Sequence, residues 1–213
     1  MLNFLKKKKP PDFAEVRELL FGDAPLSAVA PSLSAFVEAQ QALERQDHAG
    51  AIAVLRPVTE ATDRESRHKL QAWHLLRQLG VVPDQEIAKR VLGVVIEVSL
   101  PDGLDTLAAY ADHSARYINH VGRLIVWETS EPTMNATIEA VLIAGQRIAD
   151  AIGPWNGPRR APPPRSHARL NMLTPSGLHF GEAPLSALTA DALAGPVLTA
   201  GTRLMQALIA KAN

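Results

Sequence analysis

Seven histidines are the side chains of this sequence that change charge most readily near neutral pH, so they are the first candidates for chemistry. No two of them stand four residues apart, the spacing that places two metal ligands on one helical face, and no HExxH motif occurs. His113 and His120 flank a predicted strand, and a hairpin would bring them near Asp112, Asn119 and Glu128. Histidines that face the solvent in turns explain the same pattern.

Carboxylates and hydroxyls form no recognisable catalytic motif. A pair of catalytic carboxylates could be drawn from four residues on or beside predicted strands, namely Glu97, Asp105, Asp112 and Glu128. Edge strands commonly carry such charges for solubility, which explains them equally well. The sequence contains no GxSxG, GxxxxGK[ST] or GxGxxG motif. We therefore predict no catalytic residues, no cofactor and no metal ligands.

The most distinctive segment is a basic, proline-rich loop that runs from Gly157 to Arg169. It contains four arginines and no acid, and three consecutive prolines at 162–164 favour a stiff, extended conformation. Arginine side chains in such a segment suit carboxylates or phosphates on a partner. We predict that this loop binds a partner through Arg159, Arg160, Arg165, Arg169 and the preceding Trp155.

An alternative interpretation is that the loop lies over its own domain. Residues 101–158 contain seven acids and three arginines, a local excess of negative charge that the loop would neutralise. In that case the arginines keep a surface loop soluble and contact no partner.

Composition narrows the function classes. The 22 basic and 22 acidic residues balance, whereas a nucleic-acid-binding protein usually has a basic excess, so the composition disfavours a nucleic-acid partner and favours a protein partner. The absence of cysteine excludes disulfides, thiolate catalysis and iron–sulfur clusters, and it fits the cytoplasm of a bacterial cell. No run of about eighteen apolar residues occurs, so we predict no transmembrane helix.

The segment from Met1 to Pro11 reads MLNFLKKKKPP. A secretory signal places its positive charges before the apolar stretch, whereas here the lysines follow it. We expect a solvated tail that is dispensable for folding. The alternative is a weak anchor on an anionic lipid surface, because four lysines stand beside three apolar side chains.

Residues 33–80 show helical periodicity in three consecutive segments, of which the second opens at Asp47. Over residues 34–80 this stretch resembles a tetratricopeptide-type helical repeat. The residues that carry the likeness are Ala42, Leu43, Asp47, Ala51, Ile52 and Leu55, followed by Trp73, Leu76 and Gly80. The resemblance implies antiparallel helices that approach closely at small residues, and a role in protein interaction.

After a short helix at 84–90, the sequence predicts an antiparallel meander. Alternating β-branched residues indicate a strand at 92–100, although Ile87, Val91, Val94 and Val98 also fit a helix. The further elements expected are strands at 106–111, 114–120 and 123–128, a helix at 135–152, a hairpin at 168–174 and 178–182, and a helix at 189–211 kinked at Gly195–Pro196.

The fold class that follows is α+β, with helices on one side of an antiparallel sheet. We divide the chain into a tail and lead-in (1–30), a helical part (31–87) and an α+β domain (88–213), packed as one unit. The order of elements resembles that of small regulatory modules of the profilin, longin and roadblock type.

One short sequence motif occurs twice, once near each end of the chain. Residues 21–28 read FGDAPLSA and residues 180–187 read FGEAPLSA. We interpret both as the same local structure, a chain that turns at glycine and proline before a helix capped by serine.

Together these features favour a non-enzymatic interaction or regulatory protein with a protein partner. The alternative is an enzyme or a small-molecule-binding domain with a pocket near His113 and His120.

Overall fold

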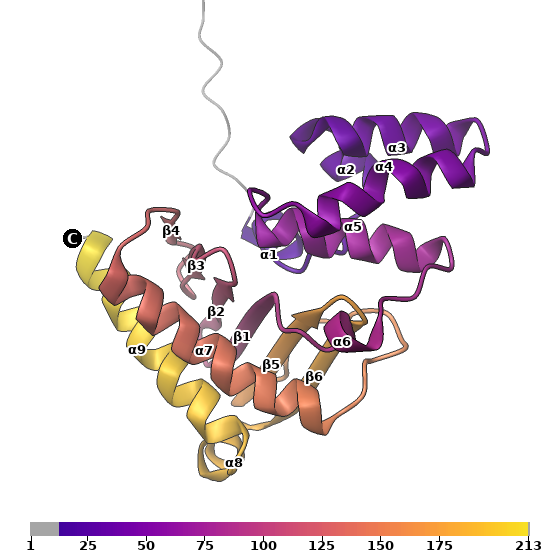
Figure 1. Cartoon of the computed structure of the whole chain (residues 1–213). Helices are drawn as coiled ribbons and strands as arrows, with labels where there is room; N and C mark the ends of the chain where they lie inside the picture. Colours follow the sequence, from indigo (N-terminus) through magenta and orange to yellow (C-terminus); the bar gives the residue numbers. More distant parts are fainter. Residues whose placement is uncertain (1–12, 213) are drawn as a thin grey trace, which may run out of the picture.

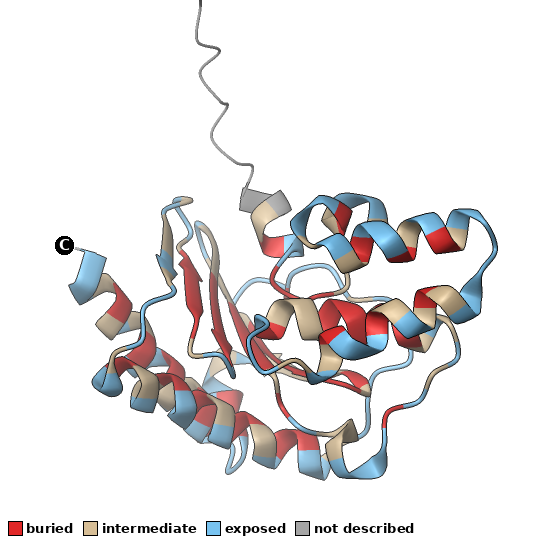
Figure 2. Ribbon diagram, turned by 45° about the horizontal axis from the view of Figure 1, so that its top comes forward, coloured by how far each residue is buried: buried red, intermediate tan, exposed pale blue. Residues whose placement is uncertain are grey.

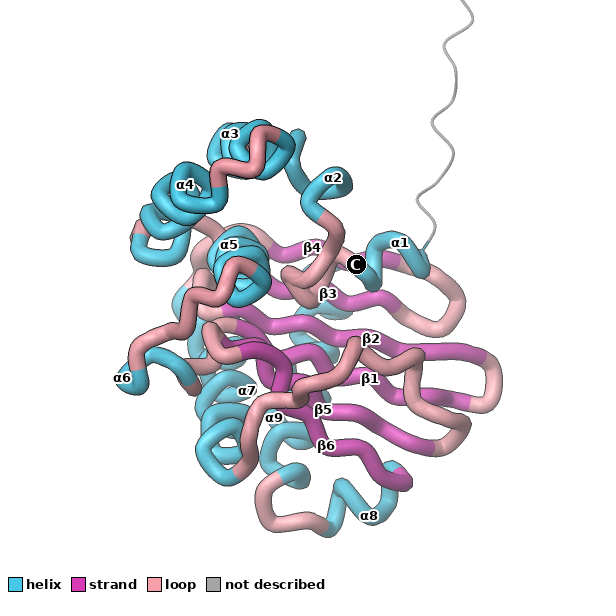
Figure 3. Tube along the Cα trace, turned by 90° about the vertical axis from the view of Figure 1, so that its right-hand side faces the viewer, coloured by secondary structure: helices cyan, strands magenta, loops and turns pink. Residues whose placement is uncertain are grey.

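A six-stranded sheet forms the centre of the molecule. The computed structural model describes residues 13–212, and within them the strands pair antiparallel in the order β4-β3-β2-β1-β5-β6 (Figure 3). The strands are β1 (Gly93–Leu100), β2 (Gly103–Tyr110), β3 (Ala115–Ile118), β4 (Leu124–Trp127), β5 (His167–Thr174) and β6 (Gly177–Pro184). The predicted α+β class, with its meander and hairpin, is confirmed.

The register explains why β1 is a central strand. Val95 lies opposite Ala108 on β2 and opposite Asn171 on β5, so both edges of β1 are paired. The second strand begins three residues earlier than predicted, because Leu100 already pairs with Gly103 across a two-residue turn. The competing helix for this segment is therefore excluded.

Two long helices cover one face of the sheet. Helices α7 (Pro132–Ala151) and α9 (Ala194–Ala212) lie side by side across it, with the short α8 (Leu185–Ala190) at their end (Figure 1). Their apolar stripes pack on the strands through residues such as Ile138, Val141 and Leu204. Close approach depends on two helical glycines. A Cβ atom at Gly145 would lie 2.6 Å from Val94, and one at Gly201 would lie 2.4 Å from Ile96.

The predicted kink at Gly195–Pro196 is wrong in position. The helical region breaks earlier, between α8 and α9, where Asp191 Oδ1 accepts hydrogen bonds from the backbone N–H groups of Leu193 and Ala194. Pro196 then lies in the first turn of α9. The N–H groups of the first turn have no partner within the helix, so the missing N–H of proline does not interrupt α9.

The N-terminal helices form a separate layer. They are α1 (Phe13–Glu18), α2 (Leu26–Val29), η1 (Ala30–Ser32), α3 (Ser34–Glu44), α4 (His48–Glu60), α5 (Ser66–Gln78) and α6 (Gln85–Ala88). Phe36, Leu55 and Leu76 form the centre of the cluster between α3, α4 and α5. Asp47 caps α4 as the sequence indicates, since its Oδ1 accepts from Gly50 N at 2.8 Å. The tetratricopeptide likeness stays a prediction.

The second face of the sheet is also covered, which differs from the expected one-sided arrangement. Leu20, Phe21 and, from α5, Leu70 pack against Val95, Ala108, Tyr110 and Leu173. The Tyr110 hydroxyl donates to Leu20 O at 2.7 Å. Both faces of β1 carry apolar side chains, so both must be removed from water. Figure 2 shows buried residues along the strands and on the sheet-facing sides of the helices.

The FGDAPLSA and FGEAPLSA segments share a helix start but differ before it. Helices α2 and α8 both begin at the leucine that follows a proline, Pro25 or Pro184, and neither has a side-chain cap. The expected serine cap is therefore wrong. Gly22 has a φ of +64°, whereas Gly181 lies within strand β6.

No helix within residues 13–212 is both long enough and apolar enough to cross a membrane. The segment from Met1 to Pro11, with its predicted tail or anchor, lies outside the described residues.

Because α5 and the sheet share one buried cluster, we expect the protein to unfold in a single calorimetric transition. Leu70→Ala should lower the midpoint of the whole transition, since truncation of a buried leucine costs about 2–5 kcal/mol. The control is Val82→Ala, which trims a side chain that is 82% exposed and should leave the midpoint nearly unchanged. Two well-separated transitions would contradict the shared cluster.

Candidate functional site

A buried carboxylate lies at the centre of the second face of the sheet. Glu97, on β1, is fully buried, and Arg17 Nε donates to its Oε1 at 2.8 Å. Asn171 Nδ2 donates to the other oxygen at 3.1 Å, and Arg169 Nη1 lies 3.7 Å from it. A buried charge is tolerated when it is paired and hydrogen-bonded, as it is in this Glu97 cluster of Glu97, Arg17, Arg169 and Asn171.

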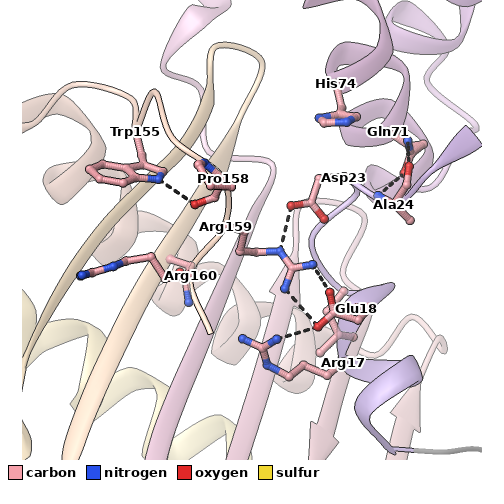
Figure 4. Close-up of polar contacts among 12 residues, drawn as sticks. Arg17, Glu18, Asp23, Ala24, Gln71, His74, Trp155, Pro158, Arg159 and Arg160 are labelled. Carbon is pink, nitrogen blue, oxygen red and sulfur yellow. Dashed lines mark hydrogen bonds and ion pairs between the residues drawn. The ribbon is translucent and has the colours of Figure 1, made fainter. Parts of the chain in front are cut away.

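The ion pairs continue outward from this cluster in both directions. Beyond Arg169 lies Glu182, whose Oε2 accepts from Arg169 Nε at 2.7 Å. Beyond Arg17 lies Glu18, which also accepts from Arg159, and Arg159 Nε donates to Asp23 at 2.8 Å (Figure 4). The result is an ion-pair chain in which each of the three arginines bridges two acids.

The electrostatics of the outer part of this chain follow from its contacts. The hydrogen bond from Arg159 lowers the pKa of Glu18 despite partial burial. Burial alone would lower the pKa of Arg159, but its hydrogen bonds with Glu18 and Asp23 outweigh burial and raise it. The Arg159 guanidinium also lies 4.2 Å from the centre of the Phe21 ring. The Arg159 side chain is therefore held in place by residues of the protein itself.

The five residues predicted to bind a partner do not lie together in one site. Arg159 and Arg169 both belong to the ion-pair chain, and Arg169 is almost fully buried. Arg165 lies elsewhere, with Nη2 donating to Pro101 O at 3.0 Å. Arg160 is exposed, and its carbonyl accepts from Arg169.

Trp155 is 46% exposed and lies edge-on to Phe180, with 5.4 Å between ring centres. The loop thus pairs with acids of its own chain, but these are Glu18, Asp23 and Glu182 and not the acids of residues 101–158 that the alternative interpretation named. Trp155 and Arg160 are left on the outside.

A polar cavity of about 300 Å³ lies beneath this loop, where it meets α5 and the β5–β6 turn. Trp155, Arg159, His74 and Arg77 contribute to its wall. Its arginines already have partners in the protein, whereas Asp23 Oδ1, also at the cavity, is buried without a hydrogen-bond partner among residues 13–212. Arg77 donates to Pro175 O at 2.6 Å, and Arg159 is bound to Asp23. A ligand here would have to compete with these contacts.

His113 and His120 do not share a pocket, because they lie at opposite ends of β3. His113, with a φ of +62°, places Nε2 2.8 Å from Glu139 on α7. His120 contacts Asp105 on β2. The four predicted carboxylates do not gather either, since Glu97 pairs with Thr106, the neighbour of Asp105, and so faces the opposite side of the sheet.

A cavity of about 350 Å³ with a mostly apolar wall lies between strands β1–β3 and helices α8 and α9, and we call it the α9 cavity. Gly201 holds α9 close to Ile96 at one wall, and the break before α9 lets α8 turn across the end. The apolar side chains that line it are Ile96, Val98, Leu107, Leu185, Leu198 and Met205.

One polar group of three residues stands at the α9 cavity. The Tyr117 hydroxyl donates to Asp105 Oδ2 at 2.8 Å, and both residues line the cavity. His120 contacts the other oxygen, Oδ1, through its backbone N–H at 2.7 Å and through Nδ1 at 3.1 Å. Burial, followed by the hydrogen bond to Asp105, raises the pKa of Tyr117 above its ordinary value, so its hydroxyl keeps its proton and remains a donor to Asp105. Asp105 is thereby fixed in orientation.

Sequence patterns alone identified Asp105 and His120 but not their setting. Tyr117 and the α9 threonines carried no signal of a site. The only hint was the spacing of Leu198, Gly201 and Met205 on one helical face, which looks like ordinary core packing.

Comparisons of this chain with family models, with curated proteins and with solved structures find no match. Among residues 13–212, no group of three or more His, Cys, Asp or Glu side chains could hold a metal ion.

The Glu97 cluster generates a prediction about stability. Arg17→Met should lower the free energy of unfolding by about 3–5 kcal/mol, because it leaves a buried carboxylate short of positive charge. Lys211→Met, which breaks an ion pair with Glu131 at a site about half exposed, should cost no more than about 1 kcal/mol. Urea unfolding of both variants measures the difference, and equal losses would contradict the assignment.

The pKa values of three histidines predict how the stability of the protein depends on pH. Burial lowers the pKa values of His68, His74 and His179 below the ordinary value of 6.5. The unfolded chain then binds protons that the folded chain resists, so stability is highest above about pH 6.5 and is lost as the pH falls below it.

Thermal melts at about pH 7.5 and about pH 5.5 check this expectation. The melting temperature should fall at the lower pH, and His179→Gln should reduce that fall. His48→Gln, at an exposed position, is the matched control. A protein that is more stable at the lower pH would refute the assignment.

Proposed function

We propose that this chain is a non-catalytic binding protein that holds a small organic ligand in the α9 cavity. The observation that carries the proposal is the cavity itself, whose volume of about 350 Å³ falls within the range of small-molecule sites. Its wall is mostly apolar and its polar groups are few and oriented, which is the usual composition of such sites. The protein has a regulatory role if a ligand in the cavity changes its affinity for a partner.

The chemistry of the cavity favours binding over catalysis. Its two titratable lining residues, Asp105 and Tyr117, are hydrogen-bonded to each other. General acid–base catalysis needs a group that is free to take up or release a proton near the working pH. A tyrosine whose pKa is raised, and which donates to a carboxylate, is suited to orientation instead.

A protein partner is a second, separate candidate. Trp155 is 46% exposed and Arg160 is exposed beside it, and half-exposed tryptophan and arginine side chains are typical of interface hot spots. This surface belongs to the loop and not to the α9 cavity. A variant that blocks the cavity therefore leaves it intact, and the two candidates can be tested independently.

The test of the cavity uses a blocking variant and a neutral probe. Phenylbutanol, which has an apolar body and no charge, should bind the wild-type protein in titration calorimetry. Thr202→Trp places a large side chain at the cavity from an exposed position, and we expect it to weaken binding at least about tenfold.

Gln206→Trp is the matched control, because Gln206 is exposed on the same helix and does not line the cavity. It should bind the probe as the wild type does. Absence of binding to the wild type, or equal binding by the two tryptophan variants, would overturn the proposed function.

A further inference from the structure

The α9 cavity presents hydrogen-bond acceptors to its interior and offers few donors. Three threonines line it together with Asp105 and Tyr117. Thr189 donates its hydroxyl proton to Leu185 O at 2.8 Å, and Thr202 donates to Leu198 O at 2.9 Å. Tyr117 donates to Asp105. The protons of the Thr189, Thr202 and Tyr117 hydroxyls are thus used within the protein, and their lone pairs remain. The third threonine, Thr199, is exposed and makes no side-chain hydrogen bond with the described residues.

Asp105 is the single charged residue in the cavity wall. Its Oδ1 is occupied by the two contacts from His120, whereas Oδ2 accepts from the Tyr117 hydroxyl. A carboxylate oxygen can accept two hydrogen bonds, so Oδ2 has capacity for one more donor. The Asp105 side chain is 19% exposed, so its charge is only partly screened by water.

Three positive groups of the surrounding surface have partners elsewhere, and Arg203 lies on the adjoining groove, which shares Thr189 and Thr199 with the cavity. Arg165 donates to Pro101 O, Arg123 donates to Ala212 O, and Lys211 pairs with Glu131. No lysine or arginine lines the cavity. A negatively charged ligand would meet a carboxylate without a compensating cation, and a neutral ligand would gain only the apolar contacts.

We infer that the ligand of the α9 cavity is an organic cation with an apolar body, whose protonated amine donates to Asp105 Oδ2. The inference rests on the proposed function, and it names the class of ligand. The six apolar side chains of the wall bury the hydrocarbon part, while Tyr117 and His120 hold the carboxylate that recognises the charge. Tyr117 and His120 are therefore positioning residues.

The experiment compares three probes that share one apolar body, namely phenylbutylamine, phenylbutanol and phenylbutyrate, in titration calorimetry at pH 7. We expect the amine to bind about tenfold tighter than the alcohol, because a hydrogen bond with a charged group contributes more than a neutral one. The acid should bind more weakly than the alcohol. Added salt should reduce the advantage of the amine and leave the alcohol unaffected.

Asp105→Asn isolates the charge. It keeps a side-chain oxygen for the contacts of Asp105, and it should bring amine and alcohol to equal affinity while the alcohol still binds. Tyr117→Phe is the companion variant, because it removes a donor from Asp105 Oδ2 and keeps the charge, so the preference for the amine should persist. If Asp105→Asn fails to fold, Asp105→Ser, which also removes the charge, takes its place and should likewise abolish the preference for the amine.

The outcomes separate the two proposals. If the alcohol binds but the amine has no advantage, the inference about the ligand class is wrong and the proposed function stands. If the alcohol does not bind the wild-type protein, the proposed function fails and the inference fails with it. An advantage of the amine that survives Asp105→Asn would also overturn the inference, since the charge would then act elsewhere.

Discussion

The second face of the sheet depends on one buried negative charge. Glu97 lies on the central strand with no exposure to solvent, and burying a carboxylate there is costly unless positive charge and hydrogen bonds surround it. Arg17 supplies them from α1, and Arg169 and Asn171 supply them from β5, which is distant in the sequence. The cluster therefore fixes where the N-terminal segment crosses the sheet, and Arg159 extends the same pairing to the proline-rich loop.

The two faces of the sheet are held by different forces. Helices α7 and α9 pack on one face through apolar side chains, with glycines at the closest points. Apolar packing and charged pairs together hold the other face. Because the ionic contacts are directional, they orient the covering segment, whereas the apolar face can leave a space beside a helix without breaking a specific bond. The α9 cavity lies on that apolar face.

Local patterns predicted the elements well, because helical and strand periodicity depend on neighbouring residues. The helices of residues 33–80, the meander and the cap at Asp47 follow from such patterns. The partners of charged residues could not be predicted in this way. Arg17 and Glu97 are 80 positions apart, and nothing in either neighbourhood indicates the pair. Arg159 looked like a binding residue for the same reason, since Glu18 and Asp23 lie on a distant segment. Glu182, by contrast, faces Arg169 across the predicted hairpin, but the register of that hairpin was not predicted. The cavity beside Asp105 arises from the packing of α9, which periodicity does not specify.

The central position of β1 determines what happens when the chain is cut into two fragments. One neighbour of this strand, β2, follows it directly, whereas the other, β5, arrives after α7 and the long loop. Its two faces are likewise covered by different parts of the chain, one by segments that precede it and the other by helices that follow it. A cut between β4 and α7 would thus yield two fragments that each lack half of the sheet's surroundings. Such fragments have complementary surfaces, which makes this site suited to a split-protein reporter that regains its fold only on reassembly.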